Sequence, residues 1–113
     1  MINPVPKPVC RKRISNPLKP ARLIDPAAVE AARKPYSEFS GFPTYGAAVH
    51  HVISVGAGGP DHRFNLIQLT AEEHVMAHKG LIKREQLFAI IAEREGVSAE
   101  FVRAEIRIMR GRT

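Results

Sequence analysis

Apolar and polar residues alternate along the chain in blocks that predict two strands followed by three helices. Residues 47–55 form an apolar, β-branched run and residues 64–69 form a second, shorter one, as expected for two strands of a small sheet. Residues 70–79, 82–95 and 99–110 are bounded by helix caps and stop signals and predict helices. This order of elements predicts an α+β fold in which a short hairpin is followed by helices.

Residues with strong preferences for helix ends support these boundaries. Asp25 followed by Pro26 predicts a further, N-terminal helix that extends to about residue 34. Thr70 and Glu73 match a capping box, in which each side chain satisfies a backbone N–H of the other residue. Gly80 suits the position after the helix because glycine adopts a positive φ without strain. The helix that follows the second strand is therefore predicted with defined ends.

The distribution of proline and of charge divides the chain into three segments. Residues 1–24 hold five prolines, a density that prevents helix and ladder formation and predicts an extended N-terminal arm. Residues 25–80 contain the hairpin and the capped helix, and residues 81–113 form a C-terminal helical pair. The arm carries a basic cluster that consists of Arg11, Lys12 and Arg13. A solvated tail and a cationic arm lying along phosphates are equally compatible with this cluster.

Charge and cysteine content narrow the class of protein. The 113 residues include 17 Lys and Arg and 11 Asp and Glu, which gives a net charge of +6 and a pI near 10.0. This balance favours nucleic acid as a partner, and an anionic membrane surface second, over a merely soluble basic protein. Cys10 is the single cysteine, which excludes an intrachain disulfide and a zinc site built from cysteines. No apolar run reaches the length of a membrane span and no signal segment is recognised, so we expect a cytoplasmic protein without a membrane partner.

Four of the five histidines fall on the predicted hairpin and helix. His50 and His51 are neighbours on the first strand, whereas His74 and His78 are four residues apart on the capped helix and share one face. Two imidazoles at that spacing can chelate one divalent cation, and a facing strand can supply a third ligand. Consecutive strand residues point to opposite sides of a sheet. One member of the strand pair is therefore expected to bind the metal, while the other remains free to act as a base.

Residues 49–78, with the sequence VHHVISVGAGGPDHRFNLIQLTAEEHVMAH, strongly resemble the core of the HNH endonucleases. The shared pattern is a His-His pair, a loop with Gly-Gly, and an asparagine that is followed nine residues later by a histidine and after four more by another. The resemblance is close over these residues and loose over the flanks. It implies a ββα-metal fold, in which a hairpin and one helix surround a metal ion. It also implies a metal-dependent DNA endonuclease of the small, stand-alone kind that phages and prophages often encode.

The resemblance implies a role for each polar residue of the pattern. His51 would be the general base that deprotonates water, and Asn65 would hold the loop between the strands and keep His51 oriented. The implied metal ligands are His50, His74 and His78. In the same loop, His62 and Arg63 can contact the scissile or a flanking phosphate, and an ordinary role as solvated loop residues explains them equally well.

The implied chemistry is phosphodiester hydrolysis with one divalent cation. The cation would stabilise a non-bridging oxygen and the leaving 3′-oxygen, while His51 takes a proton from the attacking water. Imidazole nitrogen favours Zn²⁺, Ni²⁺ or Co²⁺, whereas nuclease function in cells usually implies Mg²⁺ or Mn²⁺, and the sequence leaves these five ions open. Two alternatives are a nuclease acting on RNA and a catalytically silent nucleic-acid-binding module with a structural metal. The catalytically silent module is the weaker alternative, because it would give His51 no role.

The chain departs from many HNH proteins at four positions. Those proteins hold a structural zinc through two pairs of cysteines, whereas the matching residues here carry hydroxyl or carboxyl groups, and hydroxyls are poor zinc ligands beside thiolates. The four residues are Ser37, Ser40, Thr70 and Glu73. We therefore expect no structural zinc, and we expect the capping box to stabilise the helix start in its place.

The C-terminal helices admit two interpretations. Residues 90–106 have glycine and apolar spacings like those of a DNA-binding helix-turn-helix, but their glutamates would face phosphates unfavourably. We therefore favour packing of two amphipathic helices on the core or on a second subunit, through Leu87, Ile90, Ile91, Phe101 and Ile106. The basic end can still contact a nucleic-acid backbone through Arg103, Arg107, Arg110 and Arg112. A homodimer, and phage packaging or other DNA-processing proteins as partners, stay open.

Overall fold

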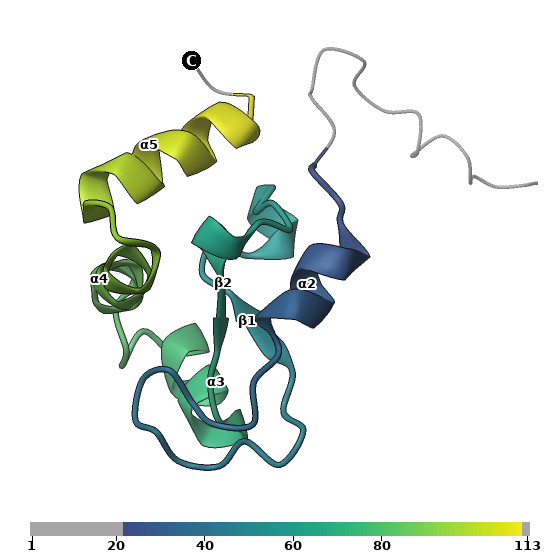
Figure 1. The fold of residues 1–113 in the computed structure, drawn as a ribbon, viewed down its shortest axis with the longest axis vertical. Helices are drawn as coiled ribbons and strands as arrows, with labels where there is room; N and C mark the ends of the chain where they lie inside the picture. The colour runs from purple at the N-terminus through teal and green to yellow at the C-terminus, as the bar shows by residue number, and fades with distance from the viewer. Residues whose placement is uncertain (1–21, 112–113) are drawn as a thin grey trace, which may run out of the picture.

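The computed structural model describes residues 22–111, whose arrangement is shown in Figure 1. A small antiparallel sheet lies at the centre, and helices lie on both sides of it (Figure 1). The basic cluster Arg11, Lys12 and Arg13 lies outside the described residues, as does most of the proline-rich segment. Within the described part of the chain, no helix has the length and apolar character needed to cross a membrane.

The central unit is a hairpin followed by a helix. Helix α2 (Pro26–Ala32) precedes strand β1 (Val49–His51), which pairs in antiparallel orientation with β2 (Leu66–Gln68). Helix α3 (Ala71–His78) follows directly after the second strand. The expected α+β fold with a small hairpin is confirmed.

Both strands comprise three residues and are shorter than the apolar runs predicted. The regular ladder ends at His51, because the side-chain oxygen of Asn65 accepts the hydrogen bond from the backbone N–H of Ile53 at 2.7 Å. Two short 3₁₀ helices overlap the predicted strands: η1 (Val55–Ala57) begins at the last residue of the first, and η2 (Arg63–Asn65) covers the first two residues of the second. A side chain therefore shapes the connection between the strands where strand pairing was expected to continue.

The predicted caps of the helix after the hairpin are present. The hydroxyl of Thr70 accepts a hydrogen bond from the backbone N–H of Glu73 at 3.1 Å, and the Glu73 carboxylate accepts one from the backbone N–H of Thr70 at 3.0 Å. Gly80, beyond the end of the helix, has a φ of +80°, the conformation for which glycine was expected. The helix that carries two of the histidines thus begins and ends close to the predicted residues.

Helices α4 (Arg84–Glu95) and α5 (Ala99–Met109) pack against the hairpin through one hydrophobic core. Its buried residues include Ile67, Leu69, Leu87, Ile91, Val102 and Ile106. The preferred interpretation, in which these helices pack on the core, is confirmed. Phe101 differs from the expectation, since its side chain is 47% exposed and meets Phe64 edge to face at the rim of the core.

Helix α2 covers the other side of the hairpin (Figure 1). Ala32 packs there with Val49 and Leu66 in a second, smaller cluster. The helix begins as predicted, with Asp25 as its cap and Pro26 in its first turn. The hairpin that carries the paired histidines is therefore held from both sides.

Candidate functional site

Three histidines from two elements meet beside the hairpin. His50 comes from β1, and His74 and His78 come from successive turns of α3. One ring nitrogen from each lies within 4.8 Å of the other two. The rings of His74 and His78 are stacked with centroids 4.9 Å apart, and the ring of His50 stands edge-on to both. These three residues are the set in which the sequence placed a metal ion.

The environment of His50 suits a metal ligand. Its side chain is buried, at 5% exposure, and its Nδ1 atom has no hydrogen-bond partner among the described residues. Burial, together with the neighbouring His74 and His78, lowers the pKa of His50 to about 4. The ring is therefore neutral at physiological pH, with a lone pair available. Because buried polar atoms nearly always have a partner, an unpartnered imidazole nitrogen in this position fits a bound ion.

The donor set decides which ions the three histidines can hold. The cluster offers three imidazole nitrogens and no carboxylate. Burial and the adjacent His78 also lower the pKa of His74, which favours the neutral form that coordinates metals. Three protein ligands leave coordination positions for water and substrate, as in catalytic metal sites. Imidazole favours Zn²⁺, Ni²⁺ and Co²⁺, whereas Mg²⁺ and Mn²⁺ prefer oxygen ligands.

His51 has a different partner from its neighbour. Its Nε2 atom lies 2.8 Å from a carboxylate oxygen of Asp61, which belongs to the loop between the strands. Burial raises the pKa of Asp61, but hydrogen bonds from His51, from the backbone of Asp25 and from Arg22 outweigh this and lower the pKa to about 2. Asp61 is therefore ionised and can only accept, so in the neutral tautomer of His51 that fits this contact Nε2 carries the proton and Nδ1 has the lone pair.

Asp61 is the residue of this site that the sequence interpretation missed. Its carboxylate also accepts from Arg22 at 2.7 Å and from the backbone N–H of Asp25 at 2.9 Å, so it is held from three directions. One signal in the sequence could have identified it. Between His51 and Asn65, Asp61 is the single acidic residue. A carboxylate is a common partner for the distal nitrogen of a catalytic histidine.

Asn65 fixes the loop that carries Asp61. It is fully buried, and its amide nitrogen donates to the backbone carbonyls of Ile53 at 3.0 Å and Pro60 at 3.1 Å. Gly59 lies so close to this clamp that a Cβ atom there would stand 1.8 Å from the Ile53 carbonyl oxygen. The expectation that Asn65 holds the loop between the strands agrees with these contacts, and Gly59 is required for the close approach.

The four positions that match zinc-binding cysteines in HNH proteins form a hydrogen-bond cluster here. The Ser37 hydroxyl donates to the Glu73 carboxylate at 2.5 Å, and it accepts from the backbone N–H groups of Phe39 and Ser40. Burial raises the pKa of Glu73, but hydrogen bonds from Ser37, Ser40 and Thr70 lower it overall. The segment before the hairpin is thus tied to the start of α3 by hydrogen bonds.

A cavity of about 220 Å³ opens beside the histidines. His50, His51 and His78 line it together with Arg84 from the start of α4. His50 and His51, which strand alternation was expected to place on opposite sides of the sheet, line the same cavity. This cavity therefore brings His51 together with two of the three clustered histidines.

His62 and Arg63 lie elsewhere. His62 Nδ1 accepts a hydrogen bond from the backbone N–H of Phe64 at 3.1 Å, and Arg63 forms an ion pair with Glu95 at 3.1 Å while its side chain stays 70% exposed. Both line a separate cavity next to α2 and are absent from the lining of the histidine cavity. The structure therefore does not bring these two residues together with the histidine cluster.

Two known proteins are similar to parts of this chain. One, "Probable mobile endonuclease E" of Enterobacteria phage T4, is 42% identical over 52 residues, which are 46% of this chain and 32% of that protein. The other, "Uncharacterized 38.5 kDa protein in psbA intron 1" of Chlamydomonas moewusii, is 59% identical over 29 residues, which are 26% of this chain and 8% of that protein. No protein-family profile and no solved structure matches the chain. The chain spans about a third or less of each relative, and over that part it is similar to a probable mobile endonuclease.

Proposed function

We propose that the chain is a metal-dependent DNA endonuclease of the HNH type, with the hairpin and α3 as a ββα-metal core. One observation carries the proposal: ring nitrogens of His50, His74 and His78 lie within 4.8 Å of one another, and His51, which is hydrogen-bonded to Asp61, lines the same cavity as His50 and His78. The partial similarity to a probable mobile endonuclease of phage T4 supports a nuclease function in general.

A divalent cation would be held by His50, His74 and His78, and when bound it supplies the positive charge that a phosphodiester needs at its non-bridging and leaving oxygens. The residues of the chain contribute the remaining steps. The buried His50 fixes one ligand position on the rigid strand, and the α3 histidines fix two more on adjacent turns. A metal site on regular elements keeps its geometry better than one on loops.

His51 acts in this mechanism as the general base. Its Nδ1 atom takes a proton from a water molecule while the water oxygen attacks phosphorus and the P–O3′ bond breaks. Asp61 accepts the hydrogen bond from Nε2–H, which fixes the tautomer and stabilises the imidazolium that forms. Arg22 and the backbone of Asp25 in turn hold Asp61. Asp61 is therefore a positioning residue, since it acts through His51.

Asn65 is a second positioning residue. It clamps the loop at Ile53 and Pro60, and Pro60 immediately precedes Asp61. Contacts of His62, Arg63 and the arm residues Arg11, Lys12 and Arg13 with phosphates remain predictions. A homodimer would pair two such sites, and two nicks on opposite strands would give a double-strand break.

Plasmid relaxation tests the proposal. We expect the wild-type protein to nick supercoiled DNA with at least one of Mg²⁺, Mn²⁺, Zn²⁺, Ni²⁺ or Co²⁺, and the His51→Ala variant to lose most of the activity while still binding metal. Glu72→Ala is the matched control, because Glu72 is an exposed residue on the same helix as two ligands. A wild type that never nicks with any of these ions, or a His51→Ala variant as active as the wild type, contradicts the proposal.

Metal affinity tests the ligand assignment separately. His74→Ala and His78→Ala should each weaken binding measured by calorimetry and lower activity in parallel. Unchanged affinity would remove these residues from the ligand set. The same assay on RNA separates the two substrate classes, because a preference for RNA over DNA would replace the DNA assignment and retain the chemistry.

A further inference from the structure

The arginines of the described residues fall into two groups. Four of the eight form ion pairs with carboxylates of this chain, and these are Arg22, Arg33, Arg63 and Arg94. The other four, which form no ion pair within residues 22–111, are Arg84, Arg103, Arg107 and Arg110. All four of the second group line a single cavity of about 290 Å³ between α4 and α5. The packing of α4 against α5 brings these arginines together, since Arg84 belongs to α4 and the others belong to α5 and its end.

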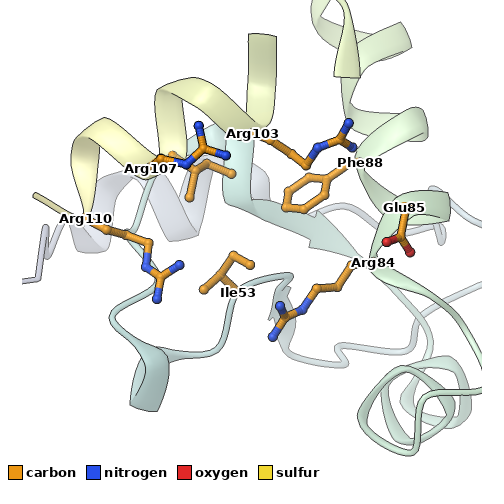
Figure 2. Close-up of a pocket in the computed structure, with 8 residues that line it drawn as sticks. Ile53, Arg84, Glu85, Phe88, Arg103, Arg107 and Arg110 are labelled. Carbon is orange, nitrogen blue, oxygen red and sulfur yellow. The ribbon is translucent and has the colours of Figure 1, made fainter. Parts of the chain in front are cut away.

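The form of this cavity indicates what it can receive. Figure 2 shows the arginines of α5 and its end, and Arg84 of α4, arranged around Ile53 and Phe88. Both of these apolar residues are already buried, at 7% and 3% exposure. The lining that a ligand can reach is largely apolar, and its charged groups are four guanidinium groups and the single carboxylate of Glu85. This excess of guanidinium groups attracts phosphate.

The arginine cavity adjoins the histidine site. Arg84 lines both cavities, and Ile53 of the arginine cavity follows His51 by two residues. At its other end, the Arg110 guanidinium donates to the carbonyl of Ala57 at 2.6 Å, while its Nε atom is buried and has no hydrogen-bond partner among the described residues. The loop that carries Asp61 is thus flanked by positive charge whose hydrogen-bonding capacity is only partly used within the described residues.

We propose that Arg84, Arg103, Arg107 and Arg110 form the phosphate-binding surface for the nucleic-acid strand that the histidine site cleaves. The inference rests on the proposed nuclease function and adds the path of the strand to it. Phosphates next to the scissile one lie in the arginine cavity, and Arg84 bridges the two sites. Binding is independent of base sequence, because guanidinium groups contact only the backbone. The substrate is therefore a strand that extends past the scissile bond, and a diester with one phosphate uses only half of the surface.

Binding to a fluorescent DNA duplex in EDTA, measured by anisotropy at several salt concentrations, tests this surface without catalysis. Each arginine that neutralises a phosphate contributes about 1 to the slope of log affinity against log salt. We expect the Arg107→Gln variant to bind more weakly with a slope smaller by about 1, and the Arg103→Gln/Arg107→Gln variant with a slope smaller by about 2. Arg33→Gln is the matched control, because it removes the same charge from an arginine that is paired with Glu30 at the end of α2, the helix on the other side of the hairpin. Its slope should equal that of the wild type.

Substrate length separates this inference from the proposed function. We expect Arg103→Gln/Arg107→Gln to lower plasmid cleavage much more than hydrolysis of bis(p-nitrophenyl) phosphate, which has one phosphate. If the variants and the wild type have the same DNA affinity and the same salt dependence, the proposed arginine surface is wrong. The histidine site remains supported in that case if the protein still nicks plasmid. A third outcome is that the wild type cleaves neither substrate while the arginine variants lose DNA binding. That result supports the arginine surface and contradicts the proposed nuclease function. If the arginine substitutions dissociate a dimer in light scattering and leave DNA affinity unchanged, the cavity is a subunit contact and the proposal fails.

Discussion

Asp61 and Glu73 are two buried carboxylates with depressed pKa values, and they belong to different parts of the molecule. Asp61 lies in the loop between the strands and receives hydrogen bonds from His51, Arg22 and the backbone of Asp25. Glu73 lies in the first turn of α3 and receives them from Ser37 and Thr70. Burial and hydrogen bonding alone do not distinguish the two groups, so neither property identifies a catalytic residue by itself.

The difference lies in what each carboxylate holds. Glu73 forms hydrogen bonds only with backbone N–H groups and hydroxyl groups, and these bonds join the start of α3 to the segment before the hairpin. One partner of Asp61 is His51, which lines the cavity beside the clustered histidines. The proposed function therefore assigns the Asp61 network to chemistry and the Glu73 network to stability, and substitutions on each side can separate the two.

The largest effect is expected for Asp61→Asn. The amide can present an N–H group to His51 and stabilise the wrong tautomer, so we expect kcat to fall by about 10²–10⁴-fold, the usual contribution of a positioned base. Asp25→Asn is the control, because asparagine caps a helix as well as aspartate does and the backbone N–H that contacts Asp61 is retained. Single-turnover cleavage with saturating metal measures the effect. A kcat for Asp61→Asn close to that of the control would remove Asp61 from the mechanism.

On the structural side, Ser37→Ala should affect stability most. It removes the short hydrogen bond to the ionised Glu73 carboxylate, an interaction worth about 1.5–3 kcal/mol, and it leaves buried groups with fewer partners. Urea unfolding should show this loss, while kcat per folded molecule should stay within about twofold of the wild type because less than 0.5 kcal/mol of the barrier is involved. A large fall in kcat with unchanged stability would place the Glu73 cluster in the site and remove the contrast with Asp61.

The sequence predicted part of the histidine site from local geometry alone. The helical repeat places His74 and His78 on one face, whereas the choice of His50 as the third ligand and of His51 as the base came from the resemblance to HNH endonucleases. Thr70 and Glu73 cap the helix through groups three residues apart, which is also a local relation. Elements of this kind follow from periodicity and capping preferences alone.

Contacts that depend on loop conformation were not predictable in the same way. Asp61 reaches His51 because Asn65 and Gly59 fold the loop back onto the end of β1, and Arg22 reaches Asp61 from a distant segment. The two strands end early for the same reason, since Asn65 replaces strand pairing with side-chain hydrogen bonds. Three arginines of α5 and its end were recognised as a basic group, but the position of Arg84 beside them depends on how α4 and α5 pack.

A smaller effect is expected at Thr70, the other hydroxyl of the Glu73 network. Thr70→Ala removes the cap to the backbone N–H of Glu73 and should lower the free energy of unfolding by about 1 kcal/mol. Thr70→Ser retains the hydroxyl and should restore most of the loss, which separates the cap from packing of the methyl group. Thermal unfolding of the three proteins provides the measurement. If Thr70→Ser is as unstable as Thr70→Ala, the hydrogen bond is not the source of the effect.

Acid provides the last test, since both carboxylates are ionised at neutral pH and become protonated only as the pH falls. The folded-state pKa of Asp61 is about 2 against an ordinary value of 3.8, so its contribution to stability is complete above the ordinary value and is lost as the pH falls toward 2. The pKa of Glu73 is also lowered, so its contribution is lost in the same direction. Asp61→Asn should therefore reduce the dependence of unfolding free energy on pH in this acid range, and Asp25→Asn is again the reference. An unchanged slope for Asp61→Asn would mean that the hydrogen bonds to Asp61 persist in the unfolded chain or are too weak to hold His51.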